Sequence, residues 1–163
     1  SLTTVIYTII ILCFYVLFFL DYKYFYLPVS INIVLIIIGI VFNAKYGLFI
    51  DEASLILNIK PILFPLYGLF LGYSSLWLVN FVFKILKKKN GIGGGDFILF
   101  GGIGSIFGPF SLPIILFMSS FLGCLYFIFS RKNIDNELPL GSFLALSSFI
   151  YFLYNFMNFS IVN

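Results

Sequence analysis

The chain has 163 residues, of which 62% are hydrophobic and 9% charged, with a net charge of +3 and a mean hydropathy of +1.15. Soluble domains carry about 25% charged residues, so this composition excludes an ordinary soluble domain and indicates a membrane protein. The length predicts one membrane-embedded domain, residues 1–163, with room for about six spans of about 20 apolar residues each.

Apolar runs separated by turn residues and charges place the predicted spans at about 2–20, 29–48, 61–86, 96–108, 111–130 and 138–158. The first run is expected to be a retained span, because no Lys or Arg precedes Lys23 and no polar cleavage region follows it. Gly108-Pro109 and Pro113 alone divide the fourth span from the fifth. The pattern predicts an all-α, polytopic membrane helix bundle with about six transmembrane helices.

Positive charges are distributed unequally between the two sides of this bundle. Lys45 and Lys60 fall on one side. Seven cations fall on the other side, namely Lys23, Lys84, Lys87, Lys88, Lys89, Arg131 and Lys132. The positive-inside rule makes the second side cytoplasmic, so both chain ends are predicted to lie outside the inner (cytoplasmic) membrane.

Two of the six acidic residues stand where a loop meets a predicted span. Asp21 and Asp96 occupy these junctions, where an ionisable group is costly unless it has a partner or a function. The topology places both on the cytoplasmic side, so two carboxylates from distant parts of the chain are expected to meet at one depth. The other four lie in hydrophilic loops, where solvation accounts for them: Asp51, Glu52, Asp135 and Glu137.

A close pair of carboxylates shares one proton, because both cannot ionise cheaply. One aspartate can then take a proton from a water molecule that attacks a peptide carbonyl, while the other protonates the carbonyl oxygen. Gly93, Gly94 and Gly95 would admit an extended substrate backbone beside Asp96 and can adopt dihedral angles closed to other residues. Alternatively, the glycines and the acid form only a loop and an N-cap for a helix that begins at Phe97.

The chain lacks the residues that other kinds of catalytic or binding site require. The chain has no histidine, which excludes Ser-His and Cys-His nucleophiles and a histidine-bound metal, and no metal site is predicted. Cys13 and Cys124 stand alone in apolar runs and are interpreted as packing residues. The stretch GIGGGD lacks the Lys-Ser/Thr of a P-loop, and no nucleic-acid partner is expected.

Pairs of small residues four positions apart recur along the spans. They are Gly68 and Gly72, Gly104 and Gly108, and Ser119 and Gly123. This spacing allows helices to approach closely in lipid, and we interpret it as membrane packing.

Three segments resemble a known family. Gly93-Gly94-Gly95-Asp96 matches the Gly-x-Gly-Asp motif of intramembrane aspartyl proteases, and its setting is similar to that of the type 4 prepilin peptidases. Asp21, Leu27-Pro28 and Gly39 resemble the segment around the family's first aspartate. The stretch LPLGSFLAL, residues 138–146, resembles its last segment of Pro, Gly and Phe.

The resemblance implies a membrane aspartic endopeptidase with Asp21 and Asp96 as catalytic residues. Its substrate would be a type IV prepilin or secretion pseudopilin, cleaved after a glycine at the end of a short basic leader. We expect no cofactor for proteolysis and the lipid bilayer as a partner; the sequence does not indicate an oligomeric state. Longer family members also methylate the new N-terminus with S-adenosylmethionine, which is expected here only if that second activity is retained.

The chain departs from the family pattern in two places. Ile98 stands where the family usually has a lysine, which could alter the pH optimum unless the lysines of 87–89 substitute. The N-terminal extension with two Cys-x-x-Cys pairs is absent, which predicts either a short-form peptidase or a chain lacking its front. Presenilin-like relatives are disfavoured, because they pair Gly-x-Gly-Asp with Tyr-Asp and this chain has Leu20-Asp21.

Two alternatives remain open. A lipoprotein signal peptidase is disfavoured because Asn43-Ala44-Lys45 lacks the aspartate of that family's Asn-x-Ala-Asp motif. The other is a non-catalytic transporter or assembly subunit, in which the two aspartates are ion ligands or helix caps.

Overall fold

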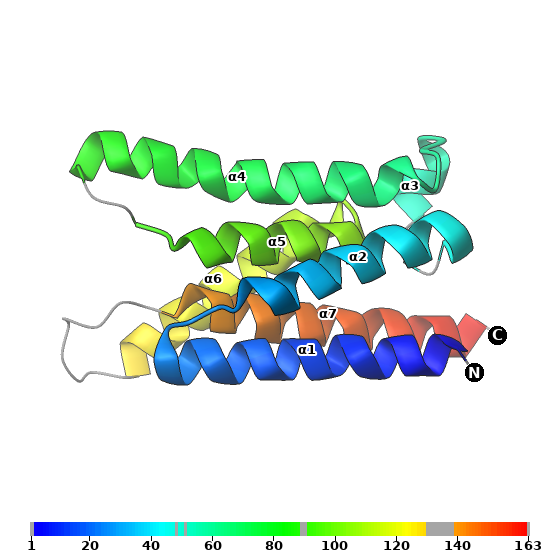
Figure 1. Ribbon diagram of the computed structural model, residues 1–163, viewed down its shortest axis with the longest axis horizontal. Helices are drawn as coiled ribbons and strands as arrows, with labels where there is room; N and C mark the ends of the chain where they lie inside the picture. Colours follow the sequence, from blue (N-terminus) through cyan, green and yellow to red (C-terminus); the bar gives the residue numbers. More distant parts are fainter. Residues whose placement is uncertain (1, 48, 51, 89–90, 130–138, 163) are drawn as a thin grey trace. The chain divides into compact units, whose positions relative to one another are not determined.

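The computed structural model describes residues 2–47, 49–50, 52–88, 91–129 and 139–162 (Figure 1). The helices in these residues are α1 (Leu2–Tyr24), α2 (Val29–Tyr46), α3 (Glu52–Ile56), α4 (Leu63–Lys87), α5 (Gly94–Phe107), α6 (Ser111–Phe129) and α7 (Leu140–Val162). Six residues named above lie outside the described ones: Asp51, Lys89, Arg131, Lys132, Asp135 and Glu137.

The all-α membrane architecture predicted from the sequence is confirmed. Among the described residues, five helices are long and apolar enough to cross a membrane: α1, α2, α4, α6 and the Leu140–Met157 part of α7. The fourth predicted span, 96–108, corresponds to the shorter apolar helix α5. Several details differ from the sequence prediction: α1 continues to Tyr24, α5 begins at Gly94, and the short helix α3 was not expected.

The chain folds as two compact units. The first comprises Ser1–Phe25 and Ile115–Asn163, and the second comprises Tyr26–Ile114. The prediction that residues 1–163 form a single domain stays a prediction.

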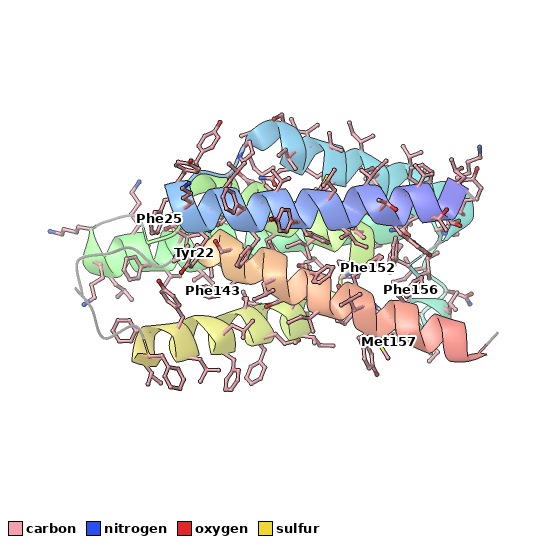
Figure 2. All side chains as sticks on the ribbon, turned by 90° about the horizontal axis from the view of Figure 1, so that it is seen from below. Tyr22, Phe25, Phe143, Phe152, Phe156 and Met157 are labelled. Atoms are coloured by element: carbon pink, nitrogen blue, oxygen red, sulfur yellow. The ribbon has the colours of Figure 1, made fainter. Side chains whose placement is uncertain are left out.

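In the first unit, α1 and α7 run antiparallel. Near the end of α1, Asp21 contacts Ser142 in the first turn of α7. Near the start of α1, Tyr7 packs edge-on against Phe152 and Phe156, which Figure 2 labels toward the other end of α7. The buried residues of α1 recur every three or four positions and so form one face: Ile6, Ile10, Phe14, Leu17 and Asp21.

In the second unit, α4 and α5 run antiparallel with their backbones in contact. Gly68 and Gly104 face each other so closely that a Cβ on either would collide with the other's carbonyl group. One turn away, a Cβ at Gly72 would lie 2.5 Å from the carbonyl oxygen of Phe100. The small-residue spacing at these positions therefore brings two backbones together, which a larger side chain would prevent.

Buried asparagines of α2 hold α5. The 14 residues of α5 extend only about 21 Å, less than the roughly 30 Å of a bilayer's hydrocarbon core. A helix this short ends where water is scarce, so the carbonyl groups of its last turn need hydrogen-bond partners from the protein. Asn43 supplies them, because its side-chain Nδ2 lies 3.0 Å from the carbonyl oxygen of Ser105 and 2.7 Å from that of Ile106. Its Oδ1 accepts a hydrogen bond from the N–H of Phe49.

Candidate active site

Asp21 lies in the last turn of α1 and is buried, with 6% of its surface exposed. Its Oδ2 atom accepts hydrogen bonds from the backbone N–H of Ser142, at 2.6 Å, and from the Ser142 hydroxyl, at 2.9 Å. Both residues belong to the first unit. The sequence analysis placed Asp21 at the junction of a span and a loop; the structure encloses it between two helices.

The hydrogen bond from the Ser142 N–H to Asp21 satisfies a backbone donor at the start of α7. The first backbone bond of α7 runs from the N–H of Phe143 to the carbonyl oxygen of Pro139, so the Ser142 N–H precedes the helical ladder. Such N–H groups need an outside acceptor, and a helix N-terminus favours a negative charge there. The carboxylate of Asp21 therefore caps α7, which lies 121 residues away in sequence.

Aromatic rings surround this end of the first unit. Tyr22 on α1 packs edge-on against Tyr126 near the end of α6, and Tyr126 contacts Phe143 on α7. Figure 2 labels Tyr22 and Phe143 at the same end of the two helices. The Lys23 ammonium lies over the rings of Phe19 and Tyr24, at 5.6 and 5.3 Å from their centroids. Rings that contact cations and remain partly exposed are typical of a membrane interface.

Asp96 lies in the first turn of α5 and is also buried, with 8% of its surface exposed. The helix begins at Gly94, two residues earlier than the sequence predicted, and its N-cap is Gly93. Asp96 is therefore inside the helix rather than its N-cap residue. A carboxylate in the first turn interacts favourably with the helix dipole.

The three glycines before Asp96 have different surroundings. None of them has a positive φ, so the conformational freedom that the sequence analysis invoked is not what this turn requires. A Cβ at Gly93 would lie 3.3 Å from Oδ2 of Asp96, and one at Gly94 would meet open space. A Cβ at Gly95 would lie 2.8 Å from the Cβ of Leu27, so packing explains this glycine.

Two asparagines fix the segment that leads to Asp96. The Oδ1 of Asn80 on α4 accepts hydrogen bonds from the N–H groups of Gly91 and Ile92, at 2.9 and 3.1 Å. Asn32 on α2 is fully buried, and its Nδ2 lies 3.4 Å from the carbonyl oxygen of Gly95. The sequence analysis did not select either residue, although a polar residue within an apolar run such as 29–48 generally faces protein.

The remaining predicted residues lie as follows. Ile98 is half-buried in the second turn of α5, and Lys87 and Lys88 are exposed at the end of α4. Cys13 is half-buried and Cys124 exposed, both as free thiols. Asp21 belongs to the first unit and Asp96 to the second. Their pairing, and the roles of Gly93 to Gly95, stay predictions.

The model of the type IV leader peptidase family matches residues 8–128 of this chain, which include both aspartates. The chain is similar to proteins named prepilin leader peptidase/N-methyltransferase. The relative from Neisseria gonorrhoeae is 36% identical over 84% of this chain and 44% of its own length. The relative from Dichelobacter nodosus is 33% identical over 90% of this chain and 46% of its own length. The relative from Escherichia coli (strain K12) is 34% identical over 80% of this chain and 55% of its own length.

The chain thus spans about half the length of the curated relatives it matches. No solved structure matches it. The family match covers most of the chain and displaces the lipoprotein signal peptidase alternative. The chain belongs to the type IV leader peptidase family.

Proposed function

We propose that this protein is an aspartic endopeptidase that removes the short basic leader of type IV prepilins or pseudopilins. Asp21 and Asp96 form its catalytic dyad, at the cytoplasmic boundary of the inner membrane. The observation that carries this proposal is that, among the described residues of this leader peptidase family member, each unit buries one aspartate at a helix end.

The path of the chain supports a location of both carboxylates on one side of the bilayer. Asp21 is at the end of α1, and the next span, α2, starts from the same side. Because Asn32 near the start of α2 lies beside Gly95, α5 starts from that side as well. The topology predicted from the distribution of cations also puts both aspartates on one side of the bilayer.

The chain also limits the distance between the two residues. Six peptide units join Asp21 to Leu27, and a fully extended chain spans at most about 3.6 Å per residue, or about 22 Å. Leu27 in turn lies against Gly95, the residue before Asp96. Loops and lids of many enzymes close on substrate binding, and a motion of this kind would bring the two carboxylates together.

In the proposed reaction, one aspartate is ionised and the other protonated. The ionised carboxylate takes a proton from water while the water oxygen bonds to the scissile carbonyl carbon, and the protonated carboxyl donates its proton to the carbonyl oxygen. The tetrahedral gem-diol then collapses and the C–N bond breaks. The leaving amine takes the proton held by the carboxyl that received it from water, and the other carboxylate takes a proton from a hydroxyl of the intermediate, which restores the starting dyad. No cofactor takes part in this sequence.

The substrate is a single-span protein with a cytoplasmic leader. Its scissile glycine would lie extended beside Gly93 and Gly94, where the absence of side chains leaves room next to Asp96. Gly95 contributes by allowing Leu27 to pack closely. A bulky residue in place of the leader's last glycine is therefore expected to block cleavage.

Methyl transfer is not part of the proposal. S-adenosylmethionine needs polar partners for its charged and ribose groups. Two grooves on the first unit are lined almost entirely by apolar side chains, one between α1 and α7 around Phe14 and Ala145, the other between α6 and α7 around Gly123 and Phe143. These grooves do not offer the polar partners that this cofactor needs.

The test uses purified protein in detergent, a prepilin, and sequencing of the product's new N-terminus. Asp21→Asn and Asp96→Asn should each nearly abolish cleavage, by at least a hundred-fold, because each removes one proton-transferring group. Glu52→Gln is the control and should stay within a few-fold of the unmodified protein. Cleavage that survives Asp21→Asn but not Glu52→Gln would refute the proposed dyad.

A further inference from the structure

The hydrogen bonds around Asp21 are concentrated on one of its two oxygens. Oδ2 accepts both the Ser142 N–H, at 2.6 Å, and the Ser142 hydroxyl, at 2.9 Å. A carboxylate oxygen has two lone pairs in the carboxyl plane, so these two donors occupy Oδ2. Neither bond uses Oδ1, which is left as the oxygen that can exchange a proton.

We propose that Ser142 is a positioning residue for Asp21, which fixes Oδ2 against the N-terminus of α7 so that Oδ1 accepts the proton of the attacking water. This inference rests on the proposed function, because it assigns a role to Ser142 only if Asp21 acts in cleavage. It goes beyond the dyad by naming the group that orients one of its members.

The backbone N–H of Ser142 and the dipole of α7 supply a fixed positive potential at Oδ2. This N–H lies in the first turn of the helix, before the first bond of the helical ladder. Hydrogen bonds to the ionised form of a carboxylate stabilise that form, and so does a helix N-terminus. These interactions offset part of the cost of burying an ionised Asp21, and they leave Oδ1 as the oxygen that receives the proton from water.

The Ser142 hydroxyl can also serve the neutral form of Asp21. A hydroxyl has one proton, and this one has two acceptors within reach, Oδ2 of Asp21 at 2.9 Å and the carbonyl oxygen of Phe18 at 3.3 Å. When Oδ1 takes a proton from water, the carboxyl becomes a weaker acceptor and the hydroxyl can turn to Phe18. Its donor therefore remains satisfied in both protonation states.

The test compares variants at position 142 with a matched serine on the same helix. Ser142→Ala should lower kcat about ten- to a hundred-fold with little change in KM, because Ser142 acts through Asp21 and not on the substrate. Ser142→Thr keeps the hydroxyl and should restore most of the rate. Ser148→Ala is the control, since Ser148 is also buried on α7 but its hydroxyl bonds the carbonyl oxygen of Leu144 in its own helix.

The outcomes separate this inference from the proposed function. Cleavage by Asp21→Asn would end the proposed function itself. An inactive Asp21→Asn together with an unchanged kcat in Ser142→Ala, a raised KM alone, or no recovery in Ser142→Thr would overturn only the role of Ser142. If Ser142→Ala does not fold, Ser142→Cys, whose thiol is a weak donor, should show an intermediate kcat, and a kcat equal to that of the unmodified protein would overturn the inference.

Discussion

Among the described residues, each unit buries one aspartate, but the two units are packed in different ways. In the second unit, glycines bring the backbones of α4 and α5 into contact, and asparagine side chains hold both ends of α5. In the first unit, α1 and α7 meet through large side chains such as Phe14 and Phe152, and a groove remains between them.

Because of this difference, we expect the two units to hold their aspartates in different ways. Backbone contact leaves few alternative arrangements, so the second unit is expected to hold Asp96 on a rigid platform. Side-chain packing tolerates adjustment, and Asp21 is instead fixed locally through Ser142. The following predictions test this comparison by making similar changes in each unit.

The largest effect is expected where backbones touch. Gly104→Ala places a methyl group against the carbonyl of Gly68, and because backbone cannot move aside as a side chain can, α4 and α5 must separate. We expect a loss of about 3 kcal/mol or more in the free energy of unfolding, measured by denaturant titration in detergent.

The matched change in the first unit is Gly123→Ala on α6. The added Cβ would lie 3.6 Å from the ring of Phe143, an ordinary contact distance, and alanine favours helix by about 1 kcal/mol over glycine. Stability should therefore stay equal or rise. Equal losses at Gly104 and Gly123 would contradict the proposed difference between the units.

A second, smaller effect is expected at Asn43. Asn43→Ala removes the partner of the Ser105 and Ile106 carbonyls and of the Phe49 N–H, and burial prevents water from replacing it readily. Each buried unsatisfied group costs about 1–3 kcal/mol, and partial relaxation should limit the total to about 2–4 kcal/mol.

Ser148→Ala provides the comparison in the first unit. Its hydroxyl bonds the Leu144 carbonyl, which already lies within a regular helix, so the loss should be under about 0.5 kcal/mol. A loss at Asn43 no larger than that at Ser148 would show that the end of α5 finds other partners.

The sequence predicted the elements of the fold better than the partners of the site. Apolar runs about 20 residues long located the spans, because a bilayer imposes that length. The spacing of Gly68, Gly72 and Gly104 indicated helix contact but not which helices would meet. The helix ends shifted by a few residues, since α1 continues to Tyr24 and α5 begins at Gly94.

The hydrogen-bond partners of the aspartates could not be predicted from the sequence, because they depend on tertiary contacts. Nothing local connects Asp21 with Ser142, which becomes a donor only when α7 begins beside the end of α1. Asn32 and Asn43 did carry a signal, as polar residues eleven positions apart, or three helical turns, in one apolar run. That spacing puts both on one face of α2, where each reaches α5.

The smallest effect is expected at the helix ends. Phe25 follows α1 with a φ of 50°, and its N–H bonds the carbonyl oxygen of Asp21, which closes the helix. Such left-handed backbone costs a residue with a side chain about 1 kcal/mol, and half of the Phe25 surface is exposed. Phe25→Gly should therefore raise the free energy of unfolding by about 0.5–1 kcal/mol and leave cleavage unchanged.

Lys88 offers the same test in the second unit. It follows α4 with a φ of 56°, and its N–H bonds the carbonyl oxygen of Lys84. Because the strain is a property of the backbone and not of either packing style, Lys88→Gly should give a gain of similar size, about 0.5–1 kcal/mol. Thermal unfolding of both variants in the same detergent measures the two gains side by side. Suppose that Lys88→Gly raises the free energy of unfolding but Phe25→Gly lowers it by about 3 kcal/mol or more. The Phe25 ring would then be packed like a core residue, and the end of α1 would be held by more than Ser142.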